Sequence, residues 1–200
     1  MLAGRRRALL ASAALPLWLA GCDDPPRPPF KSVDISGADY ADRFELPDLD
    51  GRLRTLADFR GRLPVVFFGY TQCPDVCPNT LAMLAETRAL LGPDGDKLVA
   101  VLITIDPERD TPELLRPYLA SFARDWVALR GDAARTQATA RQYKVFYRKA
   151  PGREPGRYTM DHTAASYVHD RRGRIRLYVR NGTPAADLAA DLRLLLAEPA

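Results

Sequence analysis

Cysteine is scarce in this sequence, with three residues in 200, and long apolar runs are absent from its interior. Three cysteines are too few for a small scaffold held together by several disulfide bonds. No internal apolar stretch reaches the roughly 18 residues that a membrane-spanning helix needs, which excludes a polytopic membrane protein. With 46% hydrophobic and 27% charged residues, the composition also excludes a disordered chain, collagen and a coiled coil.

Acidic residues are absent from the first 22 positions, and the excess of positive charge lies there. The formal net charge is +4, but Arg5, Arg6 and Arg7 supply three of these charges. Without them the 26 remaining basic residues nearly balance 25 acidic ones. A protein that binds nucleic acid needs a basic surface, so no nucleic-acid partner is expected.

The N-terminus has the order of a secretory signal, with three arginines followed by a dozen almost wholly apolar residues at 9–20. The string Leu19-Ala20-Gly21-Cys22 resembles a bacterial lipobox, in which the cysteine is lipidated and becomes the first residue. We therefore expect residues 1–21 to be a lipoprotein-type signal peptide. An ordinary cleaved signal, an uncleaved anchor and a twin-arginine signal remain alternatives.

The segment after the signal is rich in proline, with four prolines in residues 23–30. Such a segment is extended and semi-rigid, so residues 22–40 are expected to tether one domain, residues 41–200, to a membrane. The predicted location is the extracytoplasmic, periplasmic side of a bacterial membrane, where disulfides persist. With Cys22 lipidated, only Cys73 and Cys77 remain in the folded body.

Along this body, short apolar β-rich runs alternate with helical patterns. Apolar runs bounded by turn residues indicate buried strands, and proline or capping residues mark helix starts. Asp50-Gly51 is a strong hairpin turn signal. The pattern predicts strands over residues 63–70, 98–105, 126–129, 164–168 and 175–179, helices over 78–91, 112–122, 132–143 and 184–197, and hairpins over 44–56 and 145–160.

This alternation predicts an α/β fold with parallel strands, closed by an antiparallel β-β-α unit. A pair of cysteines stands at the first strand-to-helix junction, which narrows the prediction to a thioredoxin-like arrangement. The expected fold is therefore a three-layer α/β domain around a central mixed sheet. An N-terminal β-hairpin precedes the sheet, and a hairpin insert comes before the last strands.

The motif at that junction is Cys73-Pro74-Asp75-Val76-Cys77-Pro78. A residue before proline is disfavoured in the α region, so both cysteines are expected in a loop with the helix starting near Pro78. The helix N-terminus lowers thiol pKa values, and both redox exchange and soft-metal binding require thiolates. A structural disulfide remains the simplest alternative, although closing so short a loop stabilises a fold little.

Two thiolates do not complete a metal site. Structural zinc takes four ligands, whereas Cu(I) is soft, favours thiolate and imidazole, and accepts few. The candidate third ligand is His162, just before a predicted strand. In a thioredoxin-like topology the loop before that strand faces the cysteine loop. An ordinary hydrogen-bonded loop histidine is the alternative for His162.

Three stretches, FFGYTQCPDVCP, ITIDPERDTPE and MDHTAASYV, resemble the Sco/SenC family of copper-binding assembly proteins over residues 44–196. The resemblance implies a thioredoxin-like fold and delivery of copper, as Cu(I) or Cu(II), to the CuA centre of cytochrome c oxidase. By match of motif, it implies that Cys73, Cys77 and His162 are the copper ligands. The CuA-bearing oxidase subunit and a periplasmic copper donor are the implied partners.

Two other functions stay open. Cys73 and Cys77 could form a redox-active pair that reduces the CuA cysteines, which would make the chain a thiol-disulfide oxidoreductase and requires no histidine. A peroxiredoxin-like peroxidase shares the architecture, but nothing specific to peroxide binding stands out.

Several polar residues near the motifs could support the site. Asp106 follows a buried strand and either tunes the site or forms a helix-entry turn, and Asp161 either orients His162 or is an ordinary turn carboxylate. Met160 is expected to pack inward. Asp75 and His169 are expected to face solvent.

Overall fold

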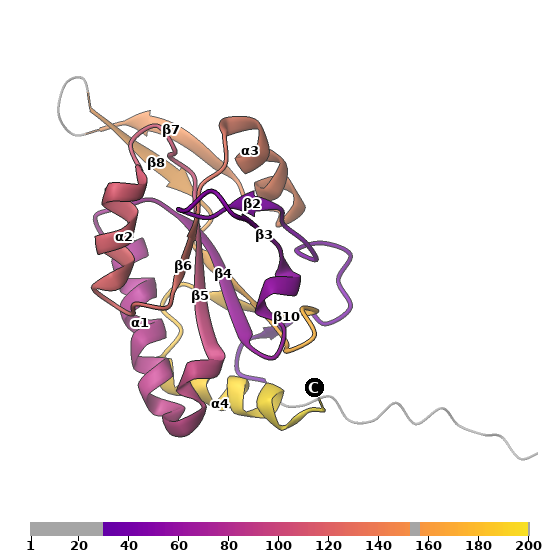
Figure 1. Ribbon diagram of the computed structural model, residues 1–200. Helices are drawn as coiled ribbons and strands as arrows, with labels where there is room; N and C mark the ends of the chain where they lie inside the picture. The colour runs from indigo at the N-terminus through magenta and orange to yellow at the C-terminus, as the bar shows by residue number, and fades with distance from the viewer. Residues whose placement is uncertain (1–29, 153–156, 200) are drawn as a thin grey trace, which may run out of the picture.

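The computed structural model describes residues 30–152 and 157–199. Its centre is a mixed six-stranded sheet in the order β1-β10-β9-β4-β5-β6 (Figure 1). The strands of this sheet are β1 (Val33–Asp34), β4 (Leu63–Gly69), β5 (Leu98–Thr104), β6 (Val127–Leu129), β9 (Ala165–His169) and β10 (Ile175–Arg180). The helices are α1 (Val76–Leu90), α2 (Pro112–Ala120), α3 (Ala133–Gln142) and α4 (Ala185–Ala197), with short 3-10 helices η1 (Leu56–Phe59) and η2 (Gly92–Lys97).

The middle of the sheet is the parallel pair β4 and β5, in which every residue is buried. They are paired in register from Leu63 with Leu98 to Gly69 with Thr104. Strand β9 runs antiparallel to β4 on the other side and pairs with β10, which makes the sheet mixed. Both central strands are continuous apolar runs, as expected for strands covered on two faces.

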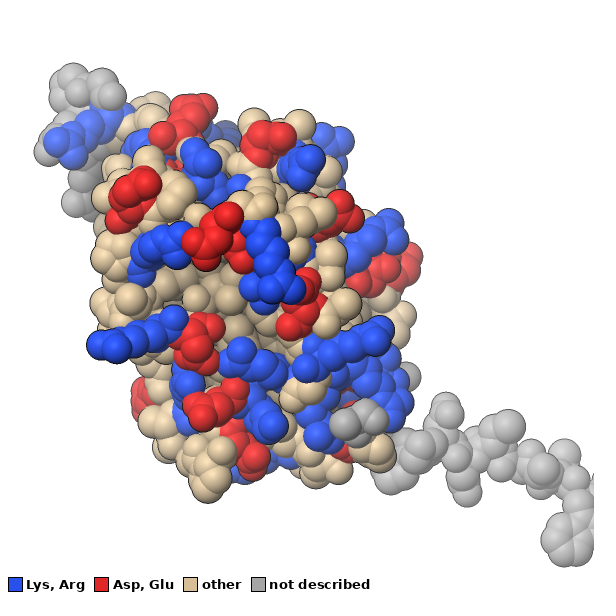
Figure 2. All heavy atoms as spheres, in the orientation of Figure 1, with Lys and Arg blue, Asp and Glu red and all other residues tan. Residues whose placement is uncertain are grey.

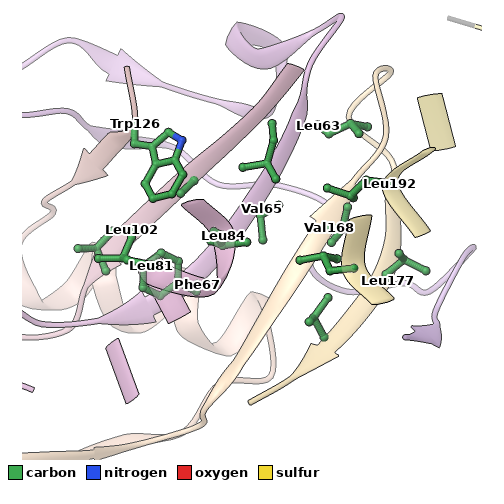
Figure 3. Packing of buried hydrophobic residues seen from close by; sticks show 14 of the residues in the cluster. Leu63, Val65, Phe67, Leu81, Leu84, Leu102, Trp126, Val168, Leu177 and Leu192 are labelled. Carbon is green, nitrogen blue, oxygen red and sulfur yellow. The ribbon is translucent and has the colours of Figure 1, made fainter. Parts of the chain in front are cut away.

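Alternate residues of β4 enter two separate cores, so the domain has three layers. Val65 and Phe67 pack among Leu81 and Leu84 of α1 and residues of α2 and α4 (Figure 3). On the other face, the β4 residues Val66 and Phe68 join a second core with Phe44, Leu56, Ala140 and Tyr143. The predicted α/β, thioredoxin-like three-layer fold is confirmed.

Two small antiparallel hairpins lie outside the main sheet. Strands β2 (Leu46–Pro47) and β3 (Leu53–Arg54) form the predicted N-terminal hairpin around Gly51, whose φ of +80° suits glycine. Strands β7 (Tyr147–Pro151) and β8 (Tyr158–His162) form the predicted insert before β9. The insert projects from the domain at the end away from α4 (Figure 1).

The chain joins the sheet earlier than residue 41. Strand β1 lies within the segment 22–40 expected to be a tether, and it pairs with β10. The carboxylate of Asp191, which is fully buried in α4, accepts the backbone amides of Lys31 at 2.7 Å and Ser32 at 2.8 Å. The expected signal peptide and Cys22 lie outside the described residues, and no described helix is long and apolar enough to span a membrane.

The expectation that His169 faces solvent was wrong. Its side chain is fully buried at the end of β9, where Nε2 donates to the carbonyl oxygen of Ala41 at 2.7 Å and also lies near the hydroxyl of Tyr143. Burial lowers the pKa of His169 below its ordinary value. The residue lies next to a polar turn in sequence, but the Ala41 segment covers it in the fold.

Candidate metal centre

Three candidate metal-ligand atoms converge at the carboxyl end of β4. The sulfur atoms of Cys73 and Cys77 and a ring nitrogen of His162 all lie within 4.8 Å of one another. The contact between Cys77 Sγ and His162 Nε2 measures 3.9 Å. Both thiols are free, and the structure therefore brings together the three residues that the sequence selects.

The two cysteines come from different local structures. Cys73 lies in the loop after β4, whereas Cys77 lies in the first turn of α1, which begins at Val76. Cys73 lies in the loop and the helix starts two residues before Pro78, close to where it was expected, but the expectation that Cys77 lies in the loop was wrong. A proline in the first turn has no intrahelical hydrogen bond to lose, so Pro78 does not stop the helix from beginning two residues earlier.

The thiols differ in exposure and in protonation. Cys77 is 1% exposed, whereas Cys73 is only partly buried and its sulfur accepts the backbone amide of Cys77 at 3.5 Å. Hydrogen bonding with the Cys77 thiol, and to a smaller extent with His162 and the amides of Asp75 and Cys77, lowers the pKa of Cys73 to about 3 against the effect of burial. The pKa of Cys77 is raised because its thiol is the donor in that bond and is buried. The two shifts have opposite directions, so Cys73 is the cysteine that loses its proton more readily.

The imidazole of His162 is oriented by a hydrogen bond to the backbone of the next residue. Its Nδ1 lies 3.0 Å from the carbonyl oxygen of Thr163, and because a carbonyl only accepts, Nδ1 carries the proton. The lone pair is then on Nε2, the atom that faces Cys77. The ring also packs edge-on against Tyr70, with 6.1 Å between the ring centroids. The histidine is therefore held in the tautomer that a metal ligand needs.

Tyr70 also ties the cysteine loop to the strand that carries the histidine. Its hydroxyl lies 2.7 Å from Thr159 Oγ1 and accepts the amide of Met160 at 3.3 Å. Met160 is 6% exposed, which confirms that it packs inward. His162 is the last residue of β8 rather than a loop residue, and its position follows from how this hairpin packs on Tyr70.

The donor set fits a soft cation with few ligands. Two sulfurs and one imidazole nitrogen are available, and no fourth histidine, cysteine or carboxylate joins the group in the part of the chain that is described. A closed structural zinc site needs four protein ligands. Cu(I) favours thiolate and imidazole, so the residues present match it better.

Comparison with known proteins places the chain in a family. Residues 33–197 match the family model described as SCO1/SenC. The chain belongs to the SCO1/SenC family. It is 33% identical to an SCO2-like protein of Rickettsia prowazekii over 132 residues, which is 66% of this chain and 64% of the relative. The match thus spans slightly less than two thirds of that relative's length.

Solved structures show the same fold. Bradyrhizobium japonicum ScoI, solved with copper bound, is 39% identical to this SCO1/SenC protein at a TM-score of 0.69, over 79% of this chain and 99% of the other. Arabidopsis thaliana ScoI, also solved with copper bound, is 27% identical at a TM-score of 0.72, over 80% of this chain and 98% of the other.

Sequence reasoning missed Arg109, which joins three parts of this SCO1/SenC protein near the ligands. Its guanidinium pairs with Asp106, donates to Gln72 Oε1 at 3.1 Å, and donates to the Tyr158 carbonyl oxygen at 2.8 Å. It also lies 3.6 Å from the centroid of the Tyr158 ring. Arg109 therefore holds the cysteine loop, the segment after β5 and the β7-β8 hairpin together. Arg109 is the fourth residue of the sequence DPERD at 106–110, and this motif is the sequence signal from which its role could have been predicted.

Asp106 and Asp110 are two buried carboxylates next to Arg109. Asp106 accepts the hydroxyl of Tyr158 at 2.8 Å, so it supports the hairpin rather than only starting a turn. Asp110 accepts the hydroxyls of Thr71 at 2.5 Å and Thr104 at 2.6 Å. Burial raises the pKa of Asp110. Thr71 is thereby fixed two residues before Cys73.

The other candidates lie outside the ligand cluster. Asp161 pairs with Arg148 at 3.1 Å and not with the imidazole, so it is a hairpin carboxylate. Asp75 is exposed, as expected, and accepts the side-chain amide of Asn79 at 2.5 Å.

Proposed function

We propose that this chain binds one copper ion through Cys73, Cys77 and His162 and delivers it to the CuA centre of cytochrome c oxidase. The convergence of the three ligand atoms within 4.8 Å is the observation that carries the proposal. The copper-bound state of the ScoI relatives from Bradyrhizobium japonicum and Arabidopsis thaliana supports copper as the ion. The resemblance in the cysteine and histidine motifs supports the CuA-bearing subunit as the acceptor.

The partial exposure of the ligand cluster suits a copper ion that is bound only temporarily and then transferred to an acceptor. Cys73 is partly exposed, so an acceptor thiolate can approach the copper beside it while Cys77 and His162 still hold the ion. Ligand exchange then passes copper along without releasing it to water. Cu(I) suits two thiolates and one imidazole, and Cu(II) could add an oxygen ligand from solvent.

We also propose where the protein is located and how its chain is divided into a signal peptide, a connecting segment and a domain. Residues 1–21 are the signal peptide, Cys22 carries the lipid, and the segment after it leads from the membrane to a copper-binding domain that includes strand β1 as well as residues 41–200. This plan keeps the domain on the extracytoplasmic side, where a periplasmic donor can supply copper and an oxidase subunit can receive it.

Thiol-disulfide exchange is the second candidate function, and the asymmetry of the cysteine pair favours it. The Cys73 thiolate would attack one sulfur of a partner disulfide, which breaks that bond and releases one partner thiolate. Cys77, after losing its proton, would attack Cys73 Sγ and release the second thiolate. Two electrons pass to the partner, and a Cys73–Cys77 disulfide remains.

A Cu(I) competition titration of the reduced protein tests the copper site. We expect tight binding of one Cu(I) per chain, and a large loss of affinity in His162→Ala because one of three ligands is removed. His169→Gln is the matched control, since it removes the other histidine and leaves the ligand cluster intact. An unchanged affinity in His162→Ala would contradict the three-ligand site.

The same variants separate the two functions. Reduced wild-type protein and His162→Ala are mixed with an oxidised CuA-domain peptide in the absence of copper, and released thiols are counted. Rapid reduction by both proteins, abolished in Cys73→Ser, would support thiol exchange. Copper transfer from the loaded protein to the reduced peptide, without disulfide chemistry, would support delivery.

A further inference from the structure

A small cleft opens beside the metal centre, where the start of α1 faces the start of β9 and the end of β10. We call it the side cleft. It has a volume of about 210 Å³, and residues of three separate segments line it. None of the three proposed metal ligands belongs to this lining, so the side cleft is distinct from the ligand cluster. The lining includes Asp75, Asn79, Thr80, Ala164, Ser166 and Arg180.

The side cleft adjoins the ligand cluster along the chain. Asp75 stands between Cys73 and Cys77, and Ala164 comes two residues after His162. Two residues of extended chain span roughly 7 Å. A specific protein interface buries about 800 Å² on each partner. An acceptor protein that reaches copper beside Cys73 therefore covers the side cleft as well.

The size of the side cleft favours a side chain of a protein partner as its occupant. Small-molecule and cofactor sites commonly measure about 300–1,000 Å³. The side cleft, at about 210 Å³, is smaller than this range. A single inserted side chain needs less room than a cofactor does, and the rest of the partner can lie on the surface outside.

A buried hydroxyl in the lining of the side cleft has no hydrogen-bond partner. Ser166 is 3% exposed, and its side chain makes no hydrogen bond to any other residue that the structure describes. Buried polar groups are normally hydrogen-bonded. The hydroxyl of Thr80 follows this rule, because it donates to the Val76 carbonyl oxygen at 2.8 Å. Ser166 therefore keeps a donor that a ligand in the side cleft can use.

The two charged residues of the lining, Asp75 and Arg180, are exposed and do not pair with each other. Asp75 accepts the side-chain amide of Asn79 at 2.5 Å. Within the described ranges Arg180 has no ion pair, not even with Asp187 in the first turn of α4. Acidic and basic side chains lie intermixed over the middle and upper part of the face drawn in Figure 2, and Arg148 beside the metal centre pairs with a carboxylate. Arg180 differs because its guanidinium has no such partner.

We infer that the side cleft receives one acidic side chain of the protein that accepts the copper ion. The Ser166 hydroxyl and the Arg180 guanidinium both donate, and a carboxylate accepts several hydrogen bonds at once. Asp75 repels a carboxylate from the end next to the cysteines, so the acidic side chain lies toward Arg180 and the acceptor binds in one orientation. This inference rests on the proposed function, because it names how the acceptor of that copper ion is recognised.

Copper transfer from the loaded, full chain to a reduced CuA domain tests the inference. The two proteins are separated at set times over a range of acceptor concentrations, and the copper in each is counted. We expect Arg180→Glu to lower the second-order rate constant roughly tenfold or more, because an attractive pair becomes a repulsive one. Ser166→Ala should lower it about twofold to tenfold. Both variants should keep the wild-type Cu(I) affinity, since neither residue is a ligand.

Arg60→Glu is the matched control for Arg180→Glu. Arg60 is also exposed, but it lies just before β4, at the end of the sheet away from the metal centre. The strand separates it from the ligand cluster by roughly 20 Å, more than the Debye length of about 8 Å at 0.15 M ionic strength. Arg60→Glu should therefore keep the wild-type transfer rate. Arg180→Lys retains the positive charge and should transfer copper faster than Arg180→Glu.

Charge reversal on the acceptor identifies the acidic side chain. Each aspartate and glutamate near the copper-binding cysteines of the acceptor is changed to arginine in turn, and one such change should restore the rate of Arg180→Glu. A wild-type rate in Arg180→Glu, or a loss that no acceptor change restores, would refute the acidic side chain and leave copper delivery intact. A wild-type protein that binds Cu(I) but transfers none would refute delivery itself and, with it, this mode of recognition.

Discussion

A Cβ atom placed on Gly69 would lie 2.6 Å from the Sγ atom of Cys77, closer than real Cβ contacts allow. The last residue of β4 must therefore be glycine for the helical cysteine to sit where it faces His162. The side chain of Leu102 closes the other side at 3.3 Å, so the strand cannot easily give way. This contact links the sheet directly to the position of a proposed ligand.

We expect Gly69→Ala to displace the Cys77 thiol and weaken Cu(I) binding by about tenfold or more, with a stability cost of about 1–3 kcal/mol from overpacking. Cu(I) competition and urea unfolding measure the two effects. Gly95→Ala is the matched control, because its Cβ would meet a backbone oxygen of Arg88 at the same 2.6 Å. A similar loss of copper affinity in both variants would contradict a specific effect on the thiol.

The two thiols should differ in reactivity. Cys73 is partly exposed with a lowered pKa, whereas Cys77 is 1% exposed with a raised pKa. We expect iodoacetamide to modify Cys73 at least about tenfold faster than Cys77 in the reduced, metal-free protein. Peptide mass spectrometry over time measures both rates. Prior loading with Cu(I) should protect both residues, and equal rates in the metal-free protein would contradict the asymmetry.

Arg109 should act as a positioning residue for the proposed site. Lysine keeps the charge of Arg109 but cannot reach Asp106, Gln72 and the Tyr158 carbonyl together with one planar group. We expect Arg109→Lys to speed amide hydrogen exchange in β8 and to weaken Cu(I) binding less than His162→Ala does.

The control for Arg109→Lys is Arg116→Lys, whose guanidinium pairs with Asp50 at an exposed position. Exposed ion pairs contribute at most about 1 kcal/mol, so this variant should leave both measurements unchanged. Exchange in β8 that stays at the wild-type rate in Arg109→Lys would refute the positioning role.

Burial of His169 should make the protein less stable in mild acid. Burial lowers the pKa of His169 in the folded state, so near pH 6.5 and below the unfolded chain takes up a proton that the folded one does not. Stability is then lost as the pH falls through this region, by up to about 1.4 kcal/mol per pH unit.

Urea unfolding at pH 7.5 and at pH 5.5 measures this loss. His169→Gln should show a smaller loss than the wild type, because glutamine does not titrate. Tyr143→Phe, a change in the same buried contact, should keep the wild-type pH dependence. An equal pH dependence in His169→Gln and the wild type would contradict the assignment to this imidazole.

The sequence by itself determined the main elements and the ligand types. Continuous apolar runs at 63–70 and 98–105 can be covered on both faces only in a central sheet, and they form β4 and β5. The pair Cys73 and Cys77 stands where a strand meets a helix, a position set by local spacing. These features are local, so neighbouring residues are enough to predict them.

The tertiary structure decided what depends on residues far apart in the chain. It placed His162 3.9 Å from Cys77, across 85 positions, through the packing of a hairpin on Tyr70. It buried His169 beneath the Ala41 segment, although the local sequence there is polar. Arg109 gained its role in the same way, since its partners come from three separate segments. Such contacts form only when distant segments pack together, and the spacing of neighbouring residues does not specify their geometry.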